Sequence, residues 1–125
     1  MNRQNISGAS PFEAIIGFSR AVRIGNVVHV SGTGPVGAED LSASEQTRHV
    51  LALIETALHQ AGAKFEHVVR TRMFIANVED WQEVGRAHGE VFGAIRPAAT
   101  MVIAQMINPK WRVEIEADAV LPGAG

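Results

Sequence analysis

The sequence predicts an α+β fold in which a single β-sheet carries two helices on one face, in the order ββαβαββ. Three observations predict this fold class. Short apolar runs read as strands, two longer segments begin with helix-capping sequences, and residues 111–120 alternate between apolar and acidic side chains. We expect all 125 residues to form one domain, with residues 1–11 as a loose polar lead-in.

The first half of the chain predicts a hairpin followed by a helix. Phe18–Arg23 and Val27–Ser31 flank Gly25-Asn26, a dipeptide typical of a tight hairpin turn. A capping box at residues 42–45 starts the helix, and Gly62 is a suitable end. The inner face of this helix consists of Val50, Ile54, Ala57, Leu58 and Ala61.

The second half predicts three strands and a second helix. Val68–Ala76 reads as a strand with Arg70, Arg72 and Phe74 on one face. A capping box at residues 80–83 starts the next helix, whose inner stripe comprises Trp81, Val84, His88, Val91 and Phe92. The last two strands, Ala98–Met106 and Trp111–Val120, are expected to form a hairpin with a turn at Asn108-Pro109.

Composition narrows the range of functions. The formal net charge of −2 gives no basis for expecting a nucleic-acid partner, and the absence of cysteine excludes disulfides and thiolate chemistry. No ligand spacing among the five histidines predicts a metal site, and His88 on the inner helix stripe reads as a satisfied core or interface histidine. We expect no cofactor. No stretch resembles a signal peptide or a membrane span, so a cytoplasmic location is expected.

The last strand places Glu114, Glu116 and Asp118 on one face, and the strand at residues 68–76 places Arg70 and Arg72 on one face at the same spacing. Two interpretations stay open. The charges either form a structural ion-pair ladder, or they line a cleft where an arginine binds a substrate carboxylate and a glutamate orients water. Because two helices cover only one face of the sheet, the charged face favours a homo-oligomer.

Several segments together resemble the RidA/YjgF family, also called endoribonuclease L-PSP. They are FSRAVRIGNVVHVSG at residues 18–32, AGAKFEHVVRTRMFIANVEDW at residues 61–81, and RPAATMVIAQMINPKWRVEIEADAV at residues 96–120. The resemblance implies a chorismate-mutase-like fold and a homotrimer with a ligand cleft between each pair of subunits. It also implies hydrolysis of small 2-enamines and 2-imines to 2-keto acids and ammonia. The family name implies a ribonuclease activity as well.

The resemblance also assigns site residues. It places the cleft serine at Ser31, followed by Gly32, and the glutamate that holds the attacking water at Glu114. The aromatic residue of the early strand is Phe18 instead of tyrosine, and Gly85 stands where the family has an asparagine. The remaining expected ligand-binding residues are Arg72, Ala99, Thr100, Met101 and Glu116.

The arginine that binds the substrate carboxylate in the family is replaced by Ala99. Loss of such a charged contact removes on the order of 2–4 kcal/mol of binding, which counts against the standard 2-imino acid deaminase activity. Arg72, or less favourably Arg96, would then supply the cation. Three functions follow in order of preference: hydrolysis of an imine, enamine or related carbonyl-derived metabolite, metabolite binding without turnover, and ribonuclease activity.

Overall fold

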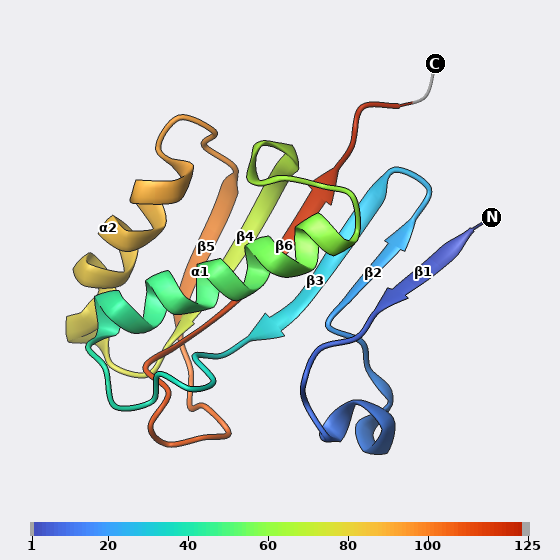
Figure 1. Ribbon diagram of the computed structural model, residues 1–125. Coiled ribbons are helices and arrows are strands. Elements are labelled where there is room, and N and C mark those ends of the chain that lie inside the picture. Colours follow the sequence, from blue (N-terminus) through green and yellow to red (C-terminus); the bar gives the residue numbers. More distant parts are fainter. Residues whose placement is uncertain (1, 124–125) are drawn as a thin grey trace.

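The computed structural model describes residues 2–123 and confirms the α+β class with one sheet and two main helices. Met1 of the predicted lead-in and residues 124–125 of the predicted domain lie outside the described residues. The sheet has the strand order β1-β2-β3-β6-β4-β5, and α1 and α2 lie on the same side of it (Figure 1). Its strands are β1 (Arg3–Ile6), β2 (Ala21–Ile24), β3 (Val27–Thr33), β4 (Val68–Ile75), β5 (Ala98–Ile103) and β6 (Val113–Val120).

The predicted hairpin and first helix are both confirmed. β2 and β3 pair antiparallel around Gly25-Asn26, and Gly25 has a φ of 58°, which favours glycine. Helix α1 (Ala43–Gln60) begins after Ser42, whose Oγ accepts a hydrogen bond from the Glu45 amide at 3.2 Å. The Ser42 hydroxyl also donates to Glu45 Oε1 at 2.9 Å. The capping sequence therefore defines the start of the helix as expected.

The second helix, α2 (Trp81–Phe92), begins at the predicted place but without the predicted cap. A short 3₁₀ turn at Val78–Asp80 precedes it, and Asp80 has helical backbone angles and makes no capping hydrogen bond. Its carboxylate instead lies 3.6 Å from the Arg112 guanidinium. Trp81 was expected on the inner stripe, yet it is 54% exposed because the helix buries the side carrying Val84 and Phe92.

Two predictions about strands were wrong. Arg3–Ile6 lies within the expected lead-in but pairs with β2 as the edge strand β1. The expected hairpin between the last two strands does not form, because β4 lies between β5 and β6 and pairs with both. The connection from β4 to β5 runs through α2, and such a helical crossover places the second strand parallel to the first.

The core fills the space between the helices and one face of the sheet. Leu51, Ile54 and Leu58 of α1 are fully buried, as are Ile75 and Ile115 of the sheet. On this side His88 Nε2 lies 2.9 Å from Thr71 Oγ1, and burial lowers the pKa of His88. His88 is therefore hydrogen-bonded in the core, the first of the two roles that the sequence predicted. The opposite, open face carries the charged residues of β4 and β6.

Candidate functional site

A β-bulge in β3 forms the centre of the candidate site. Val30 pairs with Ala117 and Thr33 with Ile115, so Ser31 and Gly32 together oppose the single residue Glu116. A bulge of this kind bends the strand and changes the direction of its side chains. It brings the Gly32 backbone against Glu114 on the open face, so closely that a Cβ atom at position 32 would overlap Glu114 Oε2. Only glycine fits there while the carboxylate keeps this place.

Glu114 of β6 has the electrostatic properties expected of a residue that moves protons. Burial raises the pKa of Glu114, the charge of Arg20 lowers it, and the charge of Glu116 raises it further. No hydrogen bond from residues 2–123 reaches this carboxylate, so both oxygens can interact with a water molecule or a ligand. A carboxyl group whose pKa is raised by burial holds its proton more tightly than an exposed one, which suits a group that donates and accepts protons.

Arg20, which the sequence analysis did not single out, completes this group of residues. Its Nη2 donates to the Gly32 carbonyl oxygen, and its guanidinium carbon lies 5.9 Å from the centre of the Phe18 ring. Burial lowers the pKa of Arg20, while the charges of Glu13 and Glu114 raise it. The sequence did contain a signal for Arg20. Strand pairing around Gly25-Asn26 extends to a hydrogen bond from the Ser31 amide to the Arg20 carbonyl, so the hairpin register places Arg20 beside Ser31.

The structure thus brings together Phe18, Ser31, Gly32 and Glu114 of the predicted site residues, and adds Arg20. The Ser31 hydroxyl donates to the Ser19 carbonyl at 2.6 Å, which fixes its orientation and leaves its oxygen free to accept a hydrogen bond. We call Phe18, Arg20, Ser31, Gly32 and Glu114 the Glu114 cluster. It combines a carboxylate, a cation, an aromatic ring and a bulged backbone on the open face of the sheet.

Arg72 lies outside this cluster and makes the contacts of an ion-pair ladder. Its Nη1 is 3.2 Å from Glu116 Oε1 and 3.2 Å from Asp118 Oδ2. Asp118 also lies 2.7 Å from His29 Nδ1. Arg70 donates to Thr100 Oγ1 at 3.0 Å. These contacts match the structural interpretation of the charged face, and a ligand-binding role for Arg72 and Glu116 stays a prediction.

The remaining predicted site residues lie on β5. Thr100 pairs with Arg72 and shares the open face, whereas Ala99 and Met101 pair with Thr71 and Met73 and share the helix-covered face. Met101 packs against the core, and its Cε lies 4.0 Å from the Cβ position of Gly85 on α2. Within one chain the sheet therefore separates the positions of Ala99, Met101 and Gly85 from the Glu114 cluster.

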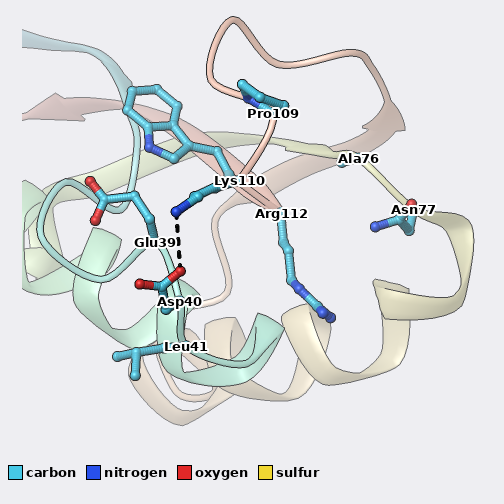
Figure 2. Close-up of a pocket in the computed structure, with 9 residues that line it drawn as sticks. Glu39, Asp40, Leu41, Ala76, Asn77, Pro109, Lys110 and Arg112 are labelled. Carbon is cyan, nitrogen blue, oxygen red and sulfur yellow. Dashed lines mark hydrogen bonds and ion pairs between the residues drawn. The ribbon is translucent and has the colours of Figure 1, made fainter.

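Two cavities of the chain lie away from all these residues. One, of about 370 Å³, is lined by residues 39–41, 76–77 and 109–112 (Figure 2). Lys110 extends toward Asp40 at 3.5 Å, and the Arg112 guanidinium extends away from that pair toward Asp80. A more apolar cavity of about 460 Å³ lies beside it, against Ile103, Met106 and Trp111. Both cations of the first cavity are already paired with carboxylates, so the Glu114 cluster remains the candidate site.

Residues 2–123 contain no group of three or more His, Cys, Asp or Glu side chains arranged to hold a metal ion. Within the same range no helix is both long enough and apolar enough to cross a membrane.

Comparisons with known proteins agree with the fold and the sequence pattern. Residues 8–121 match the family model of Endoribonuclease L-PSP. An uncharacterized protein of Streptomyces coelicolor is 34% identical over 121 residues, covering 93% of this chain and 90% of the relative. The 3-aminoacrylate deaminase RutC of Acinetobacter baylyi is 30% identical over 104 residues, covering 79% of this chain and 82% of the relative.

Solved structures support the same assignment. The crystal structure of a Mycobacterium tuberculosis member of the YjgF/YER057c/UK114 family superimposes with a TM-score of 0.90 at 46% identity. It covers 96% of this chain and 100% of that chain. A Neisseria meningitidis member of the YjgF family gives a TM-score of 0.85 at 30% identity, covering 99% of this chain and 98% of that one. The chain therefore belongs to the Endoribonuclease L-PSP family, also known as the RidA/YjgF family.

Proposed function

We propose that this protein hydrolyses a small imine or enamine to a carbonyl compound and ammonia, with Glu114 positioning the attacking water. The observation that carries the proposal is the Glu114 carboxylate, which is partly buried against the Gly32 backbone and makes no hydrogen bond to residues 2–123. Membership of a family that includes a relative named 3-aminoacrylate deaminase supports the reaction type. Which imine or enamine is the substrate depends on the residues that this chain places around Glu114.

The reaction needs proton transfers that suit a carboxyl group with a raised pKa. An enamine first accepts a proton at carbon from the protonated form of Glu114 and becomes an iminium ion, which leaves Glu114 as a carboxylate. Water then adds to the C=N carbon as the Glu114 carboxylate accepts one of its protons. The nitrogen of the resulting carbinolamine takes this proton back from Glu114. The C–N bond then breaks, ammonia leaves, and the hydroxyl proton passes to the Glu114 carboxylate as the C=O group forms. Each molecule of imine thus consumes one water.

The Gly32 backbone and Ser31 have supporting roles in this proposal. The Ser31 hydroxyl proton is held by the Ser19 carbonyl at 2.6 Å, so its oxygen can accept a hydrogen bond from a substrate N–H or from water. The ring of Phe18 lies beside the Arg20 guanidinium and adds an apolar surface to the cluster. These groups orient the reacting carbon relative to the water, and such positioning lowers the barrier without further chemistry.

We also propose that the working form is a homotrimer with a small-metabolite cleft between copies. The open face of the sheet has no helix over it, and Val102 on that face is 44% exposed. In addition, the sheet separates Ala99 and Met101 from Glu114 within one chain, so these positions can share a cleft only if a second copy contributes one of them. Native mass spectrometry and sedimentation would test the trimer. A cytoplasmic location stays a prediction.

Metabolite binding without turnover is the second candidate, and the observation that favours it is Ala99. An alanine cannot replace a bidentate contact between an arginine and a carboxylate. The ribonuclease activity in the family description ranks last, because the net charge of −2 provides no general attraction for phosphates.

Ammonia release from freshly generated 2-aminoacrylate and 3-aminoacrylate, together with neutral imines, tests the proposal. The wild type should exceed the spontaneous rate for at least one of these compounds, and Glu114→Ala should not. Glu90→Gln is the matched control, because Glu90 is a surface carboxylate on α2 paired with Arg48 at 2.9 Å. If the wild type is inactive and Ala99→Arg gains activity, the binding function replaces hydrolysis.

A further inference from the structure

We propose that Arg20 binds the carboxylate of the ligand, so that the Glu114 cluster selects small carboxylates with a cation from the same chain that supplies Glu114. The inference uses the site of the proposed function but does not require turnover. It assigns to Arg20 the contact that the sequence analysis gave to Arg72, and it explains how an anion can be held in a chain that has Ala99 in place of an arginine.

Among the arginines on the open face, Arg72 has direct counter-ions, whereas Arg20 and Arg70 have none among residues 2–123. Arg72 is paired with two carboxylates at 3.2 Å each, and Arg70 donates to the Thr100 hydroxyl. Arg20 forms no ion pair with residues 2–123, and the acceptor of its Nη2 is the neutral carbonyl of Gly32. An added carboxylate would compete with existing partners at Arg72, whereas at Arg20 it would supply a missing one.

One N–H donor of Arg20 is unsatisfied. The Nε–H group of Arg20 is buried and has no hydrogen-bond acceptor in the described part of the chain. A buried polar group of this kind is rare in a native protein and calls for an acceptor that the chain itself does not provide. A guanidinium has five N–H donors in a fixed planar arrangement, and two of its Nη–H donors can match the two oxygens of a carboxylate.

The Arg20 side chain is held in place before a ligand arrives. The Phe18 ring lies beside the guanidinium, at 5.9 Å from its carbon atom to the ring centre. A Cβ on Gly8 would lie 3.3 Å from Arg20 Cβ and Cδ, so the chain at Gly8 packs closely on the side-chain stem. Binding then orders few additional rotamers, which favours affinity.

The neighbouring acidic groups leave room for an anion. Glu13 is engaged by the Gly8 amide, whose nitrogen lies 2.8 Å from Glu13 Oε2. Burial raises the pKa of Glu114, which favours loss of its negative charge beside Arg20. A ligand carboxylate at Arg20 would bring the carbon bonded to it toward Glu114, where the proposed water is held. The same geometry serves a bound 2-oxo acid that does not react.

Binding of pyruvate, a stable 2-oxo acid, tests the inference, with pyruvamide as its neutral isostere. The full-length wild type should bind pyruvate more tightly than pyruvamide by isothermal titration and by NMR shift perturbation. Arg20→Gln should weaken pyruvate binding by about tenfold or more and leave pyruvamide binding unchanged, because only the carboxylate contact is lost. Arg20→Lys should retain part of the affinity, since it keeps the charge without the planar donor pair.

Two further variants control for the loss of a positive charge. Arg23→Gln is the matched control, because Arg23 lies on β2 only three residues after Arg20 and also donates to a main-chain carbonyl, that of Ala61 at 2.7 Å. Its pyruvate affinity should equal that of the wild type, as should that of Arg72→Gln. Pyruvate binding that is unaffected in a folded Arg20→Gln or Arg20→Lys variant, a loss confined to Arg72→Gln, or no preference of the wild type for pyruvate over pyruvamide would overturn the inference.

The outcome is separable from that of the proposed function. Arg20-dependent binding without ammonia release would keep the carboxylate site and refute hydrolysis. Ammonia release that depends on Glu114 but is insensitive to Arg20→Gln would keep hydrolysis and refute the carboxylate site. Glu114→Gln should still bind pyruvate, because the binding measurement does not depend on any reaction.

Discussion

The Glu114 carboxylate occupies the space that a side chain at Gly32 would fill. This relationship exists because the bulge in β3 places Ser31 and Gly32 opposite the single residue Glu116. The absence of a side chain on one strand therefore allows the acid on the neighbouring strand to lie over the backbone. The position of Glu114, its burial and its chemistry all depend on that glycine.

Gly32→Ala should displace Glu114 and remove activity. The new methyl group overlaps Glu114 Oε2, so the side chain must turn away, at a cost to folding stability of about 1–3 kcal/mol. Gly89→Ala is the control, because position 89 lies in α2 with no atom close to the added Cβ. It should be neutral or stabilise the fold by up to about 1 kcal/mol. Urea unfolding and ammonia release check both variants, and full activity in Gly32→Ala would refute the role of the glycine.

Glu114 should make folding stability depend on pH in a defined direction. Its folded-state pKa is raised above the usual value of 4.5 by burial, so the folded protein holds this proton more tightly than the unfolded chain. Stability from this group is present below pH 4.5 and is lost as the pH rises through the folded pKa. Glu114→Gln should therefore be more stable than the wild type near neutral pH, and the difference should shrink on acidification. Chemical denaturation across this pH range measures it, and a difference that grows on acidification would contradict the assignment.

His88 should act in the opposite sense. Burial lowers its folded-state pKa below the usual value of 6.5, so the unfolded chain takes up the proton first as the pH falls. The stability contributed by neutral His88 is present above pH 6.5 and is lost as the pH falls through this value toward the folded pKa. His88→Ala would leave the buried Thr71 hydroxyl without its partner, which costs about 1–3 kcal/mol. Thermal unfolding of His88→Ala beside the exposed control His59→Ala tests this, with equal stability of the two as the contrary result.

Gln46 should be among the most sensitive polar positions outside the site. It is fully buried, and its Nε2 contacts the carbonyls of Glu39, Leu41 and Lys110 while its Oε1 accepts from the Arg112 amide at 2.8 Å. Gln46→Leu keeps the volume but leaves these backbone groups unpaired, so we expect a loss of about 3 kcal/mol or more. Gln82→Leu, at an exposed position of α2, should change stability by less than about 0.5 kcal/mol. Comparable unfolding midpoints for the two variants would show that the network contributes little.

Local patterns in the sequence predicted much of the fold. The two-residue turn at Gly25-Asn26, the cap at Ser42 and the alternation in β6 each depend on neighbouring residues, and each was confirmed. Strand pairing over longer distances was harder to predict. Residues 96–120 read as a hairpin because two strands follow one another, yet the crossover through α2 places β4 between them. The short polar strand β1 is stabilised by its pairing with β2, which its own composition does not reveal.

The candidate site was predictable in its residue types but not in its grouping. Strand alternation places Glu114 on the open face, but the overlap with Gly32 depends on a bulge that alternation alone does not contain. Arg72 was favoured as the ligand cation because of its strand face, and the structure shows it paired with Glu116 and Asp118. A role for Arg20 could not be predicted from residue spacing, because it depends on contacts with Phe18 and Gly32 in the folded chain.

The most direct test of the central claim compares ammonia release by wild type, Glu114→Gln and Glu90→Gln on the best imine or enamine substrate. Glu114→Gln keeps the size of the side chain and removes only its ability to exchange a proton. We predict that it falls to the spontaneous rate, a loss of at least about 100-fold, while Glu90→Gln keeps the wild-type rate. Equal rates for wild type and a folded Glu114→Gln would contradict the proposed role of Glu114 in holding and deprotonating water.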